Sequence, residues 1–208
     1  MPNLWDRPEH AAGYLTRADH VPHRAEGEAV LARDLTGCLP GRLLDLGCGD
    51  GRLTEVLLAA YPGSEAVCID FSETMLTAAT ARLGGLALVV HHDLDRPLPA
   101  SGTTAGTFDA VVSSFALHHL DDTRKRSLFA EVADRLSPGG VLANLDIVAS
   151  PTPALHARWR EEMGSQDDPS DLLSSLGDQL GWLREAGLDD VDCIWKWRSL
   201  ALMRGRRF

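Results

Sequence analysis

Three glycines at alternating positions follow a short apolar run, and they mark a place where a ligand can approach the backbone. Residues 43–46 lead into Gly47, Gly49 and Gly51. Glycine has no Cβ, so it permits a tight turn and close contact between the backbone and a bound molecule. Residues 52–60 then carry apolar side chains at helical spacing. A strand that enters a helix through such a turn offers unpaired N–H groups and a partial positive charge to a polar ligand.

The glycine spacing separates two kinds of nucleotide loop. A dinucleotide-binding loop has the pattern Gly-x-Gly-x-x-Gly, in which the third glycine lets the helix pack closely on the strand. Counted from Gly47, that third position is Arg52, which is large and charged. The spacing therefore argues against a dinucleotide cofactor and against a dehydrogenase.

An acidic residue, Asp70, closes the second apolar run. In an open α/β sheet, ligands bind at the carboxyl ends of the strands, and a carboxylate there can accept hydrogen bonds from two ribose hydroxyls. Asp70 could instead cap the helix that begins near Ser72. Phe71 and Met75 could flank an adenine ring or serve only in helix packing. Asp70 thus indicates an adenosine-containing ligand without choosing among the folds that bind one.

Two adjacent histidines, His118 and His119, follow the fourth apolar run. A histidine near its usual pKa can remove a proton from a reacting group, which typically contributes ~10²–10⁴-fold to a rate. Consecutive side chains point in different directions, so we expect at most one of them to face a site. His119 is the favoured general base and His118 the alternative. A purely structural role for His119 in its loop remains an open alternative.

The elements that must position these residues form a regular series. Apolar runs at 42–46, 65–69, 87–91, 108–113 and 141–148 predict strands, and the helical patterns at 52–60, 73–83 and 123–136 between them predict a parallel sheet. We expect residues 137–140, Ser-Pro-Gly-Gly, to form a turn. A helix at 178–186 is followed by strands at 191–197 and 200–203. The two residues that link these strands are too few for a parallel crossover, so the strands must pair antiparallel.

Several of these motifs, in this order, resemble the class I S-adenosylmethionine-dependent methyltransferases of the small-molecule type. The resemblance covers about residues 41–149 and rests on the Asp-x-Gly-x-Gly-x-Gly pattern of 45–51, on Asp70, on Phe-Asp-x-Val-x-Ser followed by His-His-Leu at 108–120, and on Ser-Pro-Gly-Gly. It implies a doubly wound, Rossmann-like α/β fold with a seven-stranded, mostly parallel sheet and one antiparallel C-terminal strand. The implied cofactor is S-adenosyl-L-methionine.

The resemblance also implies roles for individual residues. Asp45 and the three glycines would hold the methionine part of the cofactor, and Asp70 its ribose. Asp93, with Asp95 as the alternative, would bind the adenine amine, and the backbone of Leu94 a ring nitrogen. Ser113 would lie beside the transferred methyl group. The N-terminal segment lies outside the resemblance, and its candidates come from chemistry: a guanidinium can pair with the cofactor's carboxylate through two hydrogen bonds. Arg24 is the candidate for this pairing and Arg17 the second choice, and Tyr14 is a candidate lid contact.

The predicted organisation has four parts. Residues 1–40 form an N-terminal helical lid, residues 41–149 the cofactor-binding core, and residues 150–176 a helical cap insertion. Residues 177–208 supply a helix and an antiparallel strand pair that complete the core. The lid and the cap match no motif, and we expect them to set the choice of methyl acceptor.

Composition limits the function classes. The 208-residue chain has a net charge of −10 and an isoelectric point near 5.2, which argues against nucleic-acid binding through its overall field. It has no apolar run of about 18 residues and no paired cysteine motif, so we expect a cytoplasmic protein without membrane contact. We predict methyl transfer to an O or N atom of a small molecule, without a metal, by a monomer or homodimer. An RNA methyltransferase of the wobble-uridine type and a non-catalytic cofactor-binding protein are the alternatives.

Overall fold

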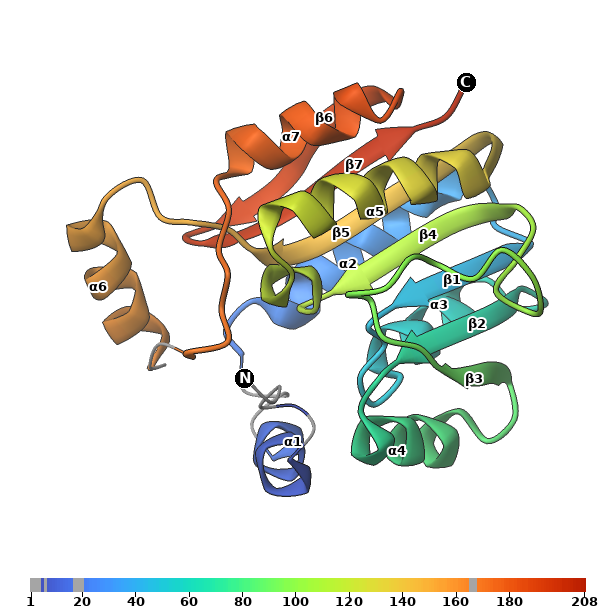
Figure 1. Cartoon of the computed structure of the whole chain (residues 1–208), viewed down its shortest axis with the longest axis horizontal. Helices are drawn as coiled ribbons and strands as arrows, with labels where there is room; N and C mark the ends of the chain where they lie inside the picture. The colour runs from blue at the N-terminus through green and yellow to red at the C-terminus, as the bar shows by residue number, and fades with distance from the viewer. Residues whose placement is uncertain (1–4, 6, 17–20, 165–167) are drawn as a thin grey trace.

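A seven-stranded sheet lies at the centre of the protein (Figure 1). The strand order is β3-β2-β1-β4-β5-β7-β6. The strands are β1 (Arg42–Leu46), β2 (Glu65–Asp70), β3 (Ala87–His91), β4 (Phe108–Ser114), β5 (Leu136–Ile147), β6 (Asp189–Trp197) and β7 (Leu200–Arg206). β7 pairs antiparallel with both β5 and β6, and the pairs among β1 to β5 are parallel. The predicted fold class and the antiparallel C-terminal pair are confirmed. This computed structural model describes residues 5, 7–16, 21–164 and 168–208.

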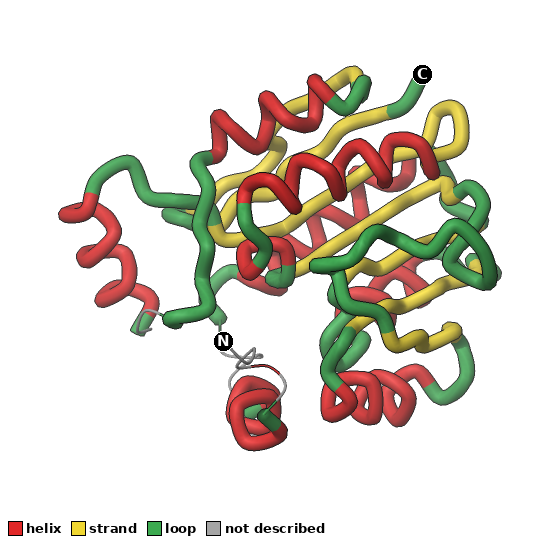
Figure 2. The backbone as a smooth tube through the Cα atoms, viewed as in Figure 1, coloured by secondary structure: helices red, strands yellow, loops and turns green. Residues whose placement is uncertain are grey.

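Helices cover both faces of the sheet (Figure 2). They are α1 (Pro8–Leu15), α2 (Arg24–Asp34), α3 (Arg52–Ala60), α4 (Glu73–Leu83), α5 (Asp122–Arg135), α6 (Pro153–Met163) and α7 (Leu176–Glu185), with short 3-10 helices at Leu35–Gly37 and Leu117–His119. On β4, Val111 packs in the cluster that contains α5 and α7, and its neighbours Ala110 and Val112 pack in the cluster that contains α2 and α3. Burial on both faces explains why the parallel strands are continuous apolar runs.

The segment Ser-Pro-Gly-Gly differs from its prediction as a turn. β5 begins at Leu136 and includes these residues, and its register with β4 shifts between Phe108 and Ala110. Gly139 adopts φ +82°, and a Cβ on Gly140 would lie 2.8 Å from the carbonyl oxygen of Ser137. The two glycines therefore permit an irregularity within the strand rather than ending it.

The segment between β5 and α7 is helical only in its first part. α6 stands apart from the sheet (Figure 1), and residues 168–175 then return to it without regular secondary structure; we call residues 168–175 the strap. The backbone N–H of Leu172 donates to the carbonyl of His118 (2.8 Å), and that of Ala149 donates to the carbonyl of Ser174 (2.9 Å). Buried Lys125 donates to the Leu172 carbonyl and, at 2.6 Å, to the Ser174 hydroxyl. These bonds fix the strap against the 3-10 helix that carries the two histidines, against α5 and against the segment after β5. Within the described residues, no helix has the length and apolar character needed to span a membrane.

Candidate active site

The three glycines after β1 share a left-handed backbone conformation but have different surroundings. Their φ angles are +66° (Gly47), +54° (Gly49) and +79° (Gly51). A Cβ on Gly47 would lie 2.4 Å from the Cβ of Ala116, and one on Gly51 would lie 3.0 Å from the side chain of Leu83. At Gly49 no described atom lies within 4 Å of that position. Gly47 and Gly51 thus allow close packing, whereas Gly49 leaves open space beside the loop.

Asp70, the last residue of β2, ties this loop in place. Its Oδ2 accepts the N–H of Gly49 and its Oδ1 accepts the N–H of Ser72, each at 2.9 Å. Burial raises the pKa of Asp70, and the backbone hydrogen bonds oppose the rise. A carboxylate offers about four acceptor positions, so capacity remains for ligand hydroxyls. The carboxylate of Asp70 can therefore hold the loop and bind a ligand at the same time.

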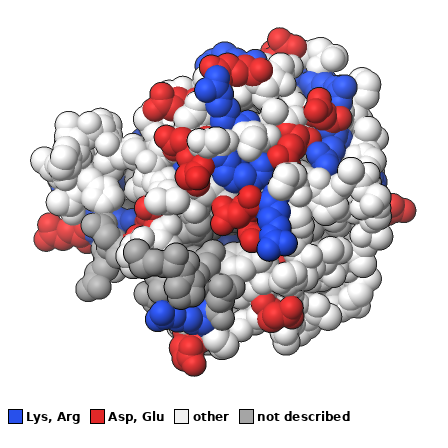
Figure 3. All heavy atoms as spheres, in the orientation of Figure 1, with Lys and Arg blue, Asp and Glu red and all other residues white. Residues whose placement is uncertain are grey.

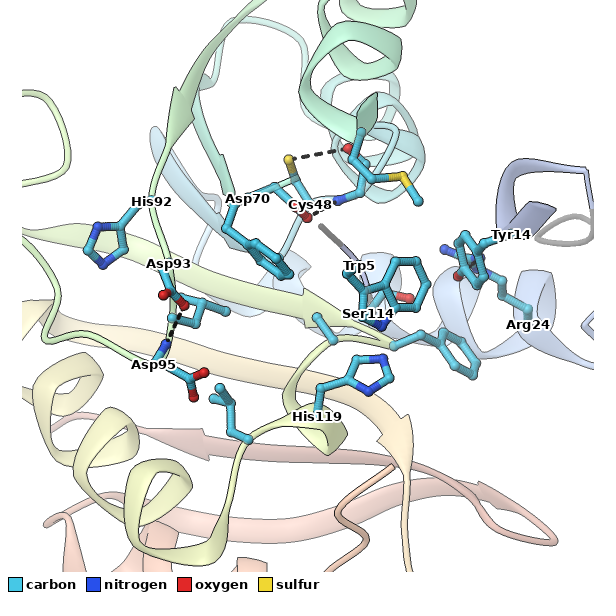
Figure 4. A pocket seen from close by; sticks show the side chains of 18 residues that line it. Trp5, Tyr14, Arg24, Cys48, Asp70, His92, Asp93, Asp95, Ser114 and His119 are labelled. Atoms are coloured by element: carbon cyan, nitrogen blue, oxygen red, sulfur yellow. Dashed lines mark hydrogen bonds between the residues drawn. The ribbon is translucent and has the colours of Figure 1, made fainter. Parts of the chain in front are cut away.

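A pocket opens beside the loop at the carboxyl ends of the strands (Figure 4). The carboxyl ends of β2 and β4, the loops after β1 and β3, and the N-terminal segment all contribute to its wall. Ten of the residues predicted for the site line it: Tyr14, Arg24, Gly47, Gly49, Asp70, Phe71, Met75, Asp93, Leu94 and His119. The structure thus brings together residues that are far apart in the sequence. Arg17, the second candidate for the cofactor carboxylate, lies outside the described residues.

Four predicted residues do not line the pocket: Asp45, Gly51, Ser113 and His118. Asp45 is buried within the sheet, where its carboxylate accepts the hydroxyl of Thr54 (2.6 Å) and burial raises its pKa to about 7. The hydroxyl of Ser113 is also turned inward, donating to the carbonyl of Leu46 (2.7 Å). Because successive strand residues face opposite sides, Ser114 takes the place in the wall that was predicted for Ser113. These four residues therefore lie outside the pocket wall, and a direct ligand contact for them stays a prediction.

The pocket wall also includes residues that the sequence analysis did not assign: Trp5, Cys48, His92, Ser114, Phe115, Ala116 and Leu120. Most are direct neighbours of assigned residues, and Ser114 directly follows the predicted Ser113. The Ser114 hydroxyl is buried and has no hydrogen-bond partner in the described part of the chain. Trp5 carries no local signal, since it reaches the pocket from the N-terminal segment. Its ring lies 5.2 Å from that of Tyr14 and 5.3 Å from that of His119, between centroids.

Arg24 and Tyr14 form a polar pair on the N-terminal side of the pocket (Figure 4). Arg24 begins α2, and its Nη1 donates to the Tyr14 hydroxyl (2.9 Å). Its Nε donates to Glu28 (2.8 Å), which also accepts from Nε of Arg52 (2.9 Å). Burial alone would lower the pKa of Arg24, but Tyr14 and Glu28 raise it. A buried, charged guanidinium therefore lies in the wall, and this group suits a carboxylate ligand.

Both candidates for the adenine amine lie in the wall beyond β3. The carboxylate of Asp93 accepts the backbone N–H of Asp95 (2.9 Å), which holds the two side chains in one turn. Burial, followed by the charge of Asp93, raises the pKa of Asp95. The carbonyl of Leu94 accepts from Nε of Arg124 (2.5 Å), so this loop is fixed to α5. Both Asp93 and Asp95 therefore line the pocket and could bind the adenine amine.

His119 faces the pocket in a defined tautomer. Its Nδ1 lies 3.2 Å from both the carbonyl oxygen and the hydroxyl of Ser170 in the strap. The Ser170 hydroxyl donates to Asp168 (2.7 Å), so we assign the proton to Nδ1, where it is donated to the Ser170 carbonyl. Nε2 then carries the lone pair. Burial and the charge of His118 lower the pKa of His119 to about 3, so the ring is neutral near pH 7.

His118 lies behind His119 and is buried. Its Nδ1 is 2.5 Å from a carboxylate oxygen of Asp146 on β5, and its Nε2 is 3.5 Å from a carboxylate oxygen of Asp171 in the strap. Burial alone would lower the pKa of His118, but Asp146 and Asp171 raise it above its usual value. The ring therefore links β5 to the strap.

A glycine-lined loop, an acidic residue on the next strand and a pocket at the carboxyl ends of a Rossmann-like sheet define a nucleotide-type cofactor site. A family model described as a methyltransferase domain matches residues 44–142. A trans-aconitate 2-methyltransferase of Methylobacterium nodulans is 30% identical over 211 residues, which cover 98% of this chain and 75% of that protein. One from Acidovorax sp. is 34% identical over 162 residues, covering 74% of this chain and 59% of that protein. Among solved structures, the S-adenosylmethionine-dependent methyltransferase SibL has a TM-score of 0.72 at 21% identity, over 96% of this chain and 61% of that chain.

The chain belongs to the class I family of S-adenosylmethionine-dependent methyltransferases, as its motifs predicted, and its cofactor is S-adenosylmethionine. The residues of the pocket fit this molecule. The open space at Gly49 gives a cradle that a Cβ would fill, and Asp70 keeps acceptor positions for ribose hydroxyls. The charge of buried Arg24 complements the cofactor's carboxylate, and the unpaired Ser114 hydroxyl offers a further polar contact.

Proposed function

We propose that this protein methylates an oxygen of a small organic acid. The observation that carries the proposal is the composition of the pocket, whose wall combines cofactor-binding groups with the lone-pair nitrogen of His119 and the ring of Trp5. The pocket is concave and is lined by both apolar and polar side chains, as small-molecule sites are. The trans-aconitate 2-methyltransferases among its relatives make unsaturated polycarboxylic acids the first acceptors to test.

Different residues of the wall bind different parts of the cofactor. Asp70 binds the ribose hydroxyls, and Asp93 or Asp95 binds the adenine amine with the backbone of Leu94. Phe71 and Met75 flank the adenine. Arg24, held by Tyr14, binds the carboxylate of the methionine part.

Bound S-adenosylmethionine supplies a sulfonium methyl group that is already activated. The main task of the chain is therefore to orient the acceptor, which can contribute about 7–11 kcal/mol to lowering the barrier. Nε2 of His119 carries the lone pair and can accept a hydrogen bond from a hydroxyl group of the acceptor, which orients it. A carboxylate acceptor is already ionised near pH 7 and needs no base, and the pKa of His119 near 3 makes its ring a poor proton acceptor there. His118 acts indirectly, since it holds the strap that positions His119.

The lid and the cap, which lie outside the cofactor-binding core, complete the site. Residues 1–40 act as a lid, which agrees with the presence of Trp5, Tyr14 and Arg24 in the wall. Residues 41–149 form the cofactor-binding core, and residues 177–208 complete its sheet. Residues 150–176 form the cap, and the strap at its end supports His119 through Ser170.

Two measurements test this function. Calorimetry with S-adenosylhomocysteine should show one site, and Arg24→Lys should weaken binding at least about tenfold because a lysine cannot make the paired bonds of a guanidinium. Arg33→Lys, on the exposed side of the same helix, is the matched control. Failure of the wild-type protein to bind would contradict the proposal, as would equal effects of the two variants.

Transfer is then measured with labelled methyl donor and a panel of acceptors. We expect methyl ester or ether products, identified by mass spectrometry, from small carboxylic acids, and none from amines or transfer RNA. Acidic and basic side chains are interspersed on the face shown in Figure 3, in keeping with a small-molecule acceptor. Labelled RNA would instead favour the nucleic-acid alternative, and binding without any transfer would favour a non-catalytic protein.

A further inference from the structure

Two histidine nitrogens and a carboxylate oxygen meet in the wall behind the pocket. Nε2 of His118 lies 3.5 Å from Oδ1 of Asp171, and Nδ1 of His119 lies 3.8 Å from the same oxygen. All three atoms lie within 4.8 Å of one another. The 3-10 helix Leu117–His119 supplies the histidines and the strap supplies the carboxylate, so residues distant in sequence converge here.

The distances are long for hydrogen bonds, whose donor and acceptor atoms lie about 2.7–3.2 Å apart. They are close to the separation of two ligands on one metal ion, since N or O ligands at about 2.0–2.1 Å in tetrahedral geometry lie about 3.3–3.4 Å apart. The two distances to the Asp171 oxygen are within a few tenths of an ångström of this separation.

The groups around the cluster orient the three atoms. Nδ1 of His118 is bound to the carboxylate of Asp146 at 2.5 Å, which directs Nε2 toward Asp171. A histidine ligand whose other nitrogen is held by a carboxylate is a recurrent arrangement in metal sites. The second oxygen of Asp171 accepts from Arg160 at 2.7 Å, so the carboxylate is also held in orientation.

We propose that His118, His119 and Asp171 bind a divalent transition-metal ion such as Zn²⁺ through Nε2, Nδ1 and Oδ1 respectively. Two imidazoles and one carboxylate are ligands that zinc accepts, and a water molecule would complete four-coordination. Binding requires both ring nitrogens as lone-pair donors, so any proton on Nε2 of His118 is released to solvent. The ion would join the histidine-bearing 3-10 helix to the strap.

The site has a consequence for the pocket, and this consequence rests on the proposed function. With a metal on Nδ1, the proton of neutral His119 moves to Nε2. The metal-bound protein then presents an N–H donor to the acceptor instead of a lone pair. Metal occupancy would therefore prevent His119 from accepting a hydrogen bond from the acceptor.

The test measures metal binding directly and needs no methyl donor. The full chain without a purification tag is treated with chelator and titrated with Co²⁺ and then with Zn²⁺. We expect one ion per chain, visible Co²⁺ bands of four-coordinate intensity, and a Zn²⁺ dissociation constant of about 1 µM or below. The midpoint of thermal unfolding should also rise with Zn²⁺ concentration, because the ion binds the folded state.

Variants separate this site from general metal binding. Asp171→Asn and His119→Gln each remove one ligand and should lower the affinity by more than about tenfold, and Asp146→Asn should lower it about 10–100-fold through the orientation of His118. His91→Gln is the matched control, an exposed histidine on β3. Near-ultraviolet circular dichroism and binding of S-adenosylhomocysteine to Asp171→Asn verify that the fold is kept.

The proposal is overturned if the wild-type chain shows no saturable binding. It is also overturned if folded Asp171→Asn and His119→Gln bind Zn²⁺ as tightly as the wild type, or if His91→Gln weakens binding equally. In each case the cluster would be an ion-pair network that only fixes the strap. Loss of S-adenosylhomocysteine binding by the wild-type protein would affect the proposed function alone.

Discussion

Replacing Gly49 with alanine tests whether the loop after β1 is a cradle for the cofactor or simply a tight turn. Gly49 adopts φ +54°, and no described atom lies within 4 Å of the position of an added Cβ. The protein can therefore accommodate the methyl group sterically. The remaining cost is that of a left-handed alanine, about 1–2 kcal/mol.

Gly84 provides a matched control. It ends α4 with φ +55°, it also has no described atom within 4 Å of an added Cβ, and it does not line the pocket. Gly84→Ala should lower the free energy of unfolding by the same 1–2 kcal/mol or so. Denaturant titration of both variants measures this shared backbone cost.

The two variants should differ in cofactor binding. Carbon atoms in contact lie about 3.5–4.0 Å apart, so a methyl group on Gly49 displaces any ligand atom packed against its Cα. We expect Gly49→Ala to bind S-adenosylhomocysteine at least about tenfold more weakly, equivalent to about 1.4 kcal/mol, and Gly84→Ala to bind like the wild type. Calorimetry on the folded variants gives both constants. Equal affinities for the two variants would refute the cradle.

Three further predictions follow from the buried polar groups. Asp70→Asn should weaken S-adenosylhomocysteine binding about tenfold or more in calorimetry, because hydrogen bonds to a charged group contribute about 1.5–3 kcal/mol; unchanged affinity would exclude Asp70 from the cofactor site. Asp45, with its pKa near 7, stays protonated in the folded protein between about pH 4 and 7, whereas the unfolded chain has lost this proton above about pH 4. The free energy of unfolding should therefore fall as the pH rises from about 4 to 7, by up to about 1.4 kcal/mol per pH unit. Denaturant titrations of wild type and Asp45→Asn should show the variant gaining relative stability across that range, and a constant difference would contradict the raised pKa. Lys125→Met should lower the free energy of unfolding by about 1–3 kcal/mol, because the Leu172 carbonyl loses its hydrogen-bond donor. The variant should also be cleaved faster by proteases within the strap, and an unchanged cleavage rate would mean that other bonds suffice to hold the strap.

The sequence predicted the sheet because local patterns controlled it. The inner parallel strands β1, β2 and β4 are buried on both faces and therefore appear as continuous apolar runs. The two-residue link before β7 left only antiparallel pairing. The misplaced turn at Ser-Pro-Gly-Gly shows the limit of this reasoning. Glycine and proline favour both a turn and a strand irregularity, and pairing with β4 and β7 decided between them.

Side-chain direction was harder to predict than residue position. Ser113 and Ser114 are neighbours of the same type, and only the placement of β4 between its two helical layers shows which one faces the pocket. For the same reason, the sequence could not separate a histidine in the wall from one buried behind it, since the direction of each ring depends on Ser170 and Asp146.

The sequence by itself thus determined the cofactor, because the glycines, the acidic strand end and the strand that contains Ser113 are local motifs whose spacing sets their chemistry. Only the tertiary structure decided how the acceptor side of the pocket is built. Trp5 and Arg24 reach it from the N-terminal segment, and the strap supports His119 from behind. Their contacts with His119 and Phe115 depend on packing between segments that share no local pattern.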